Sequence, residues 1–206
     1  MTPDKSKPAL LKPVRLPRIT EVALREAALA HLARFSATEA GLRRVLGNRI
    51  RRFARAAAEV GQESEAIATT VAAAQALAAT IAARLVQVGV VDDAAFAQAR
   101  ARRLRRAGRS SRAMLAHLAA KGVDGETARH ALAQEHLPDE LTAALILCRK
   151  RRFGGFAPNA GEDPVEPPQR LKWLASLARA GFTGDIAHRA LRMTRREAEA
   201  VLETSR

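Results

Sequence analysis

Arginine is the residue type whose clustering in this sequence points most directly to a chemistry. One cluster places seven guanidinium groups within 13 residues, with no acidic residue among them: Arg100, Arg102, Arg103, Arg105, Arg106, Arg109 and Arg112. The second cluster is Arg149, Lys150, Arg151 and Arg152, and a third is spread over residues 43–55. Guanidinium groups bind phosphates and carboxylates through paired hydrogen bonds. The clusters therefore predict a negatively charged partner, with nucleic acid first and an acidic protein surface second.

The other reactive side chains do not form a catalytic or metal-binding pattern. Cys148 is the single cysteine and lies in an apolar helical segment, where a buried, inert thiol is expected. No phosphate-binding GxxxxGK[ST] loop is present, and Asp92 and Asp93 are explained as helix-capping residues. The five histidines are scattered and form no HExxH pattern: His31, His117, His130, His136 and His188. We therefore expect no enzymatic activity, no cofactor and no metal.

The first arginine cluster is expected to occupy one side of a helix. Phe96, Ala97, Leu104 and Ala107 would form its inward face, and the outward face would carry Arg102, Arg105, Arg106 and Arg109. Like charges at these spacings destabilise a helix, so a negatively charged partner would relieve a cost. Aromatic residues are too few for stacking on bases, so contacts to DNA would be to its backbone and sensitive to salt. A GC-rich genome also enriches Ala and Arg, and that alternative explanation of the charge stays open.

Composition and proline placement predict an all-α protein. The 206 residues carry a formal net charge of +14 and only 3 % aromatic residues, with Ala and Arg abundant and no proline between Arg18 and Leu137. Helix N-caps and glycine stops then delimit the segments, beginning with a capping box at Ser36–Glu39. We predict helices over residues 20–35, 36–55, 66–88, 93–107, 111–120, 125–135, 138–152, 169–180 and 184–202.

Residues 66–83 contain no charged side chain and are long enough to cross a membrane. Ten of these 18 residues are alanine, and the larger apolar side chains form one helical stripe. We therefore interpret the segment as a helix that packs against other helices, and we expect no membrane association.

An internal repeat relates two helical pairs. Residues 114–132 match residues 173–191 without a gap at nine of 19 positions, and the paired glycines Gly122/Gly181 and Gly125/Gly184 are the most informative. The sequence thus predicts tandem three-helix repeats that form an elongated, curved array. The expected divisions are a basic disordered tail (1–18), a first repeat with a basic insertion (19–91), a second repeat (92–137) and a third with a Pro-rich loop at 154–168 (138–206).

Several segments resemble the RecX family, bacterial regulators of the RecA recombinase. The most specific is Gly89-Val-Val-Asp92-Asp93-Ala-Ala-Phe96-Ala97, followed by a basic helix over residues 100–108. Residues 27–32 together with residues 36–42 look like the family's opening helix pair, and the Leu-rich segments ending at Gly122-Val123 and Gly181-Phe182 are also similar to the family. The resemblance covers about residues 20–200. The chain departs from it in lacking tyrosine, in an apparent insertion at 47–75 and in the Pro-rich loop.

This resemblance implies a cytoplasmic, monomeric protein that binds in the groove of RecA filaments on DNA. There it would limit recombination, ATP turnover and co-protease activity, and so regulate DNA repair and the SOS response, without catalysis of its own. The predicted contact residues are those of the first two clusters, Arg100–Arg112 and Arg149–Arg152, and reversal of the outward face to glutamate should abolish inhibition. One alternative is a stand-alone helix-turn-helix regulator that binds duplex DNA, and another is a helical scaffold with no nucleic-acid role.

Overall fold

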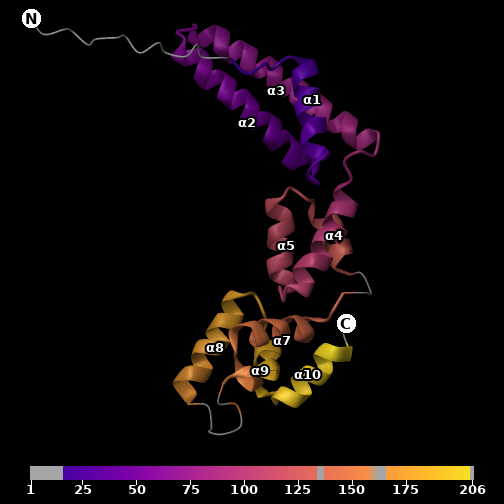
Figure 1. The fold of residues 1–206 in the computed structure, drawn as a ribbon, viewed down its shortest axis with the longest axis vertical. Helices are drawn as coiled ribbons and strands as arrows, with labels where there is room; N and C mark the ends of the chain where they lie inside the picture. Colours follow the sequence, from indigo (N-terminus) through magenta and orange to yellow (C-terminus); the bar gives the residue numbers. More distant parts are fainter. Residues whose placement is uncertain (1–15, 134–136, 159, 161–165, 205–206) are drawn as a thin grey trace, which may run out of the picture. The chain divides into compact units, whose positions relative to one another are not determined.

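The computed structural model describes residues 16–133, 137–158, 160 and 166–204. Every regular element in these ranges is helical, which confirms the predicted all-α class (Figure 1). The chain divides into two compact units, residues 1–91 and 92–206. The first unit has one buried core and the second unit has two.

The first unit is a group of three helices that all contact one another. Leu24, Leu42, Leu46, Ile50 and Ile81 form the centre of its core. The helices are α1 (Glu21–Leu32), α2 (Glu39–Glu59) and α3 (Ser64–Gln87).

Helix α3 is long and apolar enough to cross a membrane, judged by its length and composition alone. Its buried residues, among them Ala78, Ala82 and Leu85, pack into the core with α1 and α2. Of the predicted apolar stripe, Ile81 and Leu85 are buried in this core, whereas Val88 at its end is exposed.

The second unit contains two helical groups with separate cores. Met114 and Leu118 centre the core of the first group, and Leu145 and Leu177 centre that of the second. The first group is α4 (Asp93–Arg106), α5 (Ser111–Ala120) and α6 (Gly125–Leu132). The second is α7 (Glu140–Arg151), the short 3-10 helix η1 (Gly154–Phe156), α8 (Pro167–Arg179), α9 (Gly184–Arg192) and α10 (Arg195–Thr204).

The two copies of the internal repeat fall on equivalent helix pairs, α5–α6 and α8–α9. In both pairs the turn contains a glycine with positive φ, 85° at Gly122 and 90° at Gly181. Helix α6 packs on α4 as well as on α5, and α9 packs on α7 as well as on α8. Each copy is therefore completed by the helix that precedes it.

Among the described residues, six helices end in the same hydrogen-bonded turn. The amide after the left-handed residue donates to the carbonyl oxygen five residues back, as in Val123 to Leu118 (3.1 Å) and Phe153 to Cys148 (2.9 Å). Five of these turns place a glycine in the left-handed conformation, which a residue without a Cβ adopts at little cost. The sixth, at the end of α7, uses Arg152 (φ 57°, ψ 52°), the one non-glycine residue with positive φ in the described part of the chain.

Two of the predicted helices differ from the structure, one in its start and one in its continuity. Helix α2 is capped by Thr38, not Ser36, because the Thr38 hydroxyl accepts the Gly41 amide at 2.9 Å. The predicted helix over 184–202 is two helices, because Thr194 and Glu197 form a reciprocal capping box that starts α10. The predicted tail lies outside the described residues up to position 15, as does the predicted end of the helix at 134–135.

Close packing at Gly108 makes its replacement a test of this fold. A Cβ at Gly108 would lie 2.8 Å from Ile146 Cγ2 and 3.0 Å from the Ala143 carbonyl oxygen, and φ there is +80°. We expect Gly108→Ala to lower the free energy of unfolding by about 2–4 kcal/mol, since left-handed strain and overpacking add. Gly61→Ala, with a similar φ of +78° and open space around it, should cost only about 1 kcal/mol. Chemical denaturation measures both, and equal losses would contradict the packing described.

Candidate functional site

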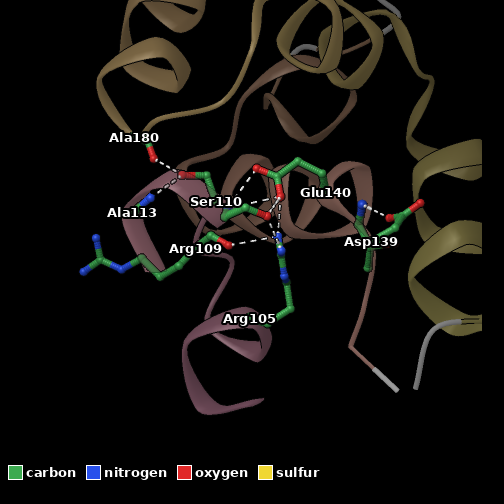
Figure 2. Close-up of polar contacts among 9 residues, drawn as sticks. Arg105, Arg109, Ser110, Ala113, Asp139, Glu140 and Ala180 are labelled. Carbon is green, nitrogen blue, oxygen red and sulfur yellow. Dashed lines mark hydrogen bonds and ion pairs between the residues drawn. The ribbon is translucent and has the colours of Figure 1, made fainter. Parts of the chain in front are cut away.

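The structure separates the arginines of the first cluster by exposure. Arg102, Arg106 and Arg109 are exposed at i, i+4 and i+7, and we call these three the α4 arginine face. Arg103 and Arg112 are also exposed, whereas Arg100 is half-buried. Figure 2 shows the Arg109 side chain extending away from the buried contacts beside it.

Arg105 is not on this face, and the prediction that it lies outward is wrong. The residue is 4 % exposed. Its guanidinium donates to Glu140 Oε2 at 2.5 Å, to Ser111 Oγ at 2.6 Å and to the Arg109 carbonyl at 3.3 Å (Figure 2). The physical reason is its register: Arg105 follows Ala97 and Ala101 at intervals of four, on the buried side of α4.

Glu140 is the partner of Arg105, and sequence reasoning missed it. Both of its carboxylate oxygens accept the Ser111 amide, at 3.0 and 3.1 Å, and Oε2 also accepts the Ser111 hydroxyl at 2.6 Å. Glu140 is the first residue of α7, and Ser111 is the first residue of α5. The carboxylate therefore lies at two helix N-termini, where the helix dipole and unpaired amides favour negative charge.

Ser110 makes a second connection between the two helical groups. Its fully buried hydroxyl donates to the Ala180 carbonyl at the end of α8 (2.6 Å) and accepts the Ala113 amide (3.2 Å) at the start of α5 (Figure 2). Serine at a helix start is a recognisable cap signal, but the contact with Ala180 is 70 residues away in the sequence. The turn between α4 and α5 is thus fixed by α7 and α8.

Arg100 and His117 form a polar contact between α4 and α5. The Arg100 Nε–H donates to Nε2 of His117 at 2.9 Å. Partial burial, together with the positive charges of Arg100, Lys121 and Arg109, lowers the pKa of His117 below its ordinary value. His117 is therefore suited to accept a hydrogen bond from Arg100, and Arg100 has an intramolecular role at this site.

The second cluster is divided in the same way. The Lys150 ammonium donates to the Ala107 carbonyl (2.8 Å), and Arg151 donates to Ser176 Oγ (2.5 Å). Arg149 and Arg152 are exposed and both line a hollow at the end of α7. The cluster is therefore not one uniform basic surface.

Metal binding and thiol chemistry find no support in the described residues. Among them, no three His, Cys, Asp or Glu side chains gather closely enough to hold a metal ion; His136 lies outside these ranges. Cys148 is buried in the core of α7–α10, and burial raises the pKa of its thiol to about 12. A neutral thiol is a poor nucleophile and a poor metal ligand.

Comparisons with known proteins agree on one family. Residues 92–132, which form α4–α6, match the family model of the second three-helix domain of RecX. The chain is 36 % identical over 190 residues to the regulatory protein RecX of Myxococcus xanthus, covering 92 % of this chain and 94 % of that protein. It is 36 % identical over 117 residues to the regulatory protein RecX of Agrobacterium fabrum, covering 56 % and 59 %.

A solved structure shares the fold. The crystal structure of RecX from Lactobacillus salivarius matches with a TM-score of 0.53 at 17 % sequence identity. The match covers 84 % of this chain and 94 % of that one.

Removal of the Arg105 side chain should destabilise the second unit. Arg105→Ala leaves the Glu140 carboxylate without its ion pair, so we expect a loss of about 3 kcal/mol in the free energy of unfolding. Arg102→Ala, on the exposed side of the same helix, should change it by less than about 0.5 kcal/mol. Urea denaturation followed by circular dichroism distinguishes them, and a small loss at Arg105 would show that the ion pair contributes little.

The thiol of Cys148 should react only after unfolding. At pH 8 the native protein should react with an aromatic disulfide reagent many times more slowly than the urea-unfolded chain. Because the pKa is raised by folding, this group adds stability that is present below pH 9 and is lost as the pH rises toward 12. Fast labelling of the native protein at pH 8 would contradict the burial of the thiol.

Proposed function

This chain belongs to the RecX family of regulatory proteins, and from that premise we propose that it binds the RecA recombinase filament and inhibits its activities. The activities concerned are recombination, ATP hydrolysis and co-protease function, so the protein would regulate DNA repair. We further infer that it acts in the cytoplasm, as a monomer, without a cofactor and without catalysing a reaction. The similarity over 92 % of this chain to a regulatory RecX protein carries the proposal.

The α4 arginine face supplies a contact surface for this role. Three guanidinium groups are exposed on consecutive turns of α4 and the turn after it, with Arg103 and Arg112 nearby in the sequence and also exposed. The described ion pairs of the second unit involve other residues, Arg105 with Glu140 and Arg195 with Glu199. Acidic side chains of the recombinase or phosphates of its DNA would therefore find these guanidinium groups accessible.

Rigidity of the surface also favours binding. The turn that carries Arg109 is held on its inner side by Arg105, which donates hydrogen bonds to the Arg109 carbonyl and to Glu140. A preordered surface loses less conformational entropy on binding than a flexible one. Contacts to DNA would be to its backbone and would weaken as salt rises.

Charge reversal of the α4 arginine face tests the proposal. The variant Arg102→Glu, Arg106→Glu and Arg109→Glu should raise the concentration needed for half-inhibition of RecA-driven ATP hydrolysis by more than about tenfold. Arg105 is left intact, because a glutamate there would meet Glu140 and unfold the unit. A matched control reverses Arg179, Arg189 and Arg196, which are exposed on α8, α9 and α10.

The results distinguish the candidate functions. Equal inhibition by the wild-type chain and both variants would show that the α4 arginine face does not contact the recombinase filament. Tight, sequence-selective binding to duplex DNA without any effect on the recombinase would instead favour a stand-alone helix-turn-helix regulator. If the wild-type chain neither inhibits the recombinase nor binds DNA, the proposal as a whole is contradicted.

A further inference from the structure

A basic hollow lies at the end of α7. It has a volume of about 290 Å³ and is lined by Arg149, Arg152, Phe156, Ala157, Pro158 and Arg195. Three of these six residues carry guanidinium groups, and none of the described residues that line the hollow is an aspartate or a glutamate. The hollow belongs to the second unit and is formed by different residues from the α4 arginine face.

Two residues of the second basic cluster line the hollow, and two do not. Arg149 and Arg152 are three positions apart, whereas Lys150 and Arg151 bind the Ala107 carbonyl and the Ser176 hydroxyl. Of these four neighbouring charged residues, Lys150 and Arg151 therefore bind groups within the unit, and Arg149 and Arg152 line the hollow.

The third guanidinium comes from α10, and a glycine makes its approach possible. A Cβ at Gly155 would lie 2.6 Å from the Arg195 amide nitrogen and 2.7 Å from the Met193 carbonyl oxygen. Only a residue without a side chain permits η1 and the start of α10 to come this close. The Nε of Arg195 donates to Glu199 at 2.9 Å in an exposed pair, which uses one of its five donor N–H groups.

Arg152 has the backbone conformation that glycine adopts in the other five helix-ending turns. Its φ of 57° brings the Cβ of an L-residue close to the following carbonyl oxygen, and glycine would relieve that strain. The chain thus retains an unfavourable backbone conformation at one of three gathered like charges. Strain that persists at one position points to a role for its side chain.

We propose that this hollow binds a phosphate of a nucleic-acid backbone. The planar guanidinium fork fits the oxygens of a phosphate, and three of them can share one phosphodiester and its neighbour. Phe156, Ala157 and Pro158 add an apolar lining against which a sugar can pack. The volume of about 290 Å³ leaves room beyond a single carboxylate. The choice of DNA as the ligand rests on the proposed function, and the site itself rests on the geometry.

Relief of the strain gives an experiment in which stability and binding change in opposite directions. Arg152→Gly and Arg152→Asn both suit the left-handed conformation, so the melting temperature of either variant should equal or exceed that of the wild-type chain. Both should weaken binding of the full chain to a fluorescent single-stranded oligodeoxynucleotide by about tenfold, because a charged hydrogen-bonded contact is lost. The slope of log affinity against log salt should fall by about 0.7 per lost contact.

The neighbouring arginine of α10 provides a matched control. Arg195→Ala should weaken DNA binding, whereas Arg196→Ala removes the same charge from an exposed residue outside the hollow and should leave the affinity within about twofold. If Arg152→Gly, Arg195→Ala and Arg196→Ala all bind DNA alike, the proposal is overturned.

Competing anions identify the occupant. Poly-glutamate and ATP are titrated against the wild-type chain and Arg152→Gly by calorimetry, alongside the oligonucleotide. Loss of binding to the oligonucleotide in the variant supports the proposal. Loss of binding to poly-glutamate or to ATP alone, with DNA affinity unchanged, overturns it in favour of an acidic peptide or a free nucleotide.

The outcome is separate from that of the proposed function. Inhibition of RecA-driven ATP hydrolysis is measured in parallel with the same variants. If Arg152→Gly keeps full DNA affinity while the wild-type chain inhibits the recombinase, the hollow loses its role and the proposed function stands. If the wild-type chain does not inhibit the recombinase but Arg152→Gly loses DNA affinity, the hollow keeps its role in DNA binding and the proposed function fails.

Discussion

The carboxylate of Glu140 is the point on which the second unit depends. It neutralises the buried Arg105 guanidinium, caps the first amide of α5 and lies at the start of its own helix. A buried guanidinium is costly unless it is paired and hydrogen-bonded, and its Nε has no hydrogen-bond partner among the described atoms. The hydrogen bonds that Arg105 donates to Glu140, Ser111 and the Arg109 carbonyl therefore have to offset this cost. Together with the Ser110 contact to Ala180 and the Lys150 contact to Ala107, they join two helical groups that have separate cores.

Contacts within the fold also reduce the number of positive charges that a partner can reach. The net charge of +14 suggests a broadly basic surface, but Arg100, Arg105, Lys150 and Arg151 each bind a group within the protein. The exposed basic residues of the second unit include a row on α4 and the lining of the hollow at the end of α7. The basic side chains that bind groups within the protein stabilise the backbone. The exposed basic side chains project from that stabilised backbone. Affinity for a partner would then depend on a few arginines and not on the total charge.

Local signals predicted most of the helices because local interactions determine their ends. Asp92 and Asp124 cap helices as their positions after glycine-containing turns indicated, and Gly89, Gly108 and Gly122 end them. The errors arose where the deciding contact was distant or where two local signals competed. No periodicity could show that Arg105 would meet Glu140, 35 residues away. The break at Thr194 was readable, since Thr194-Arg-Arg-Glu197 has the spacing of a capping box.

The helix-ending turns show how one backbone geometry can serve two purposes. At Gly108 and Gly181 the missing side chain lets the turn touch Ile146 and Ser110, so the left-handed residue is used for close packing. At Arg152 the same conformation carries a long cationic side chain to the rim of a hollow. The Phe153 amide still closes the turn on Cys148, so the backbone under Arg152 is fixed. A side chain on a fixed backbone loses less freedom when it binds an anion, so the proposed binding would offset a strain that glycine would have avoided.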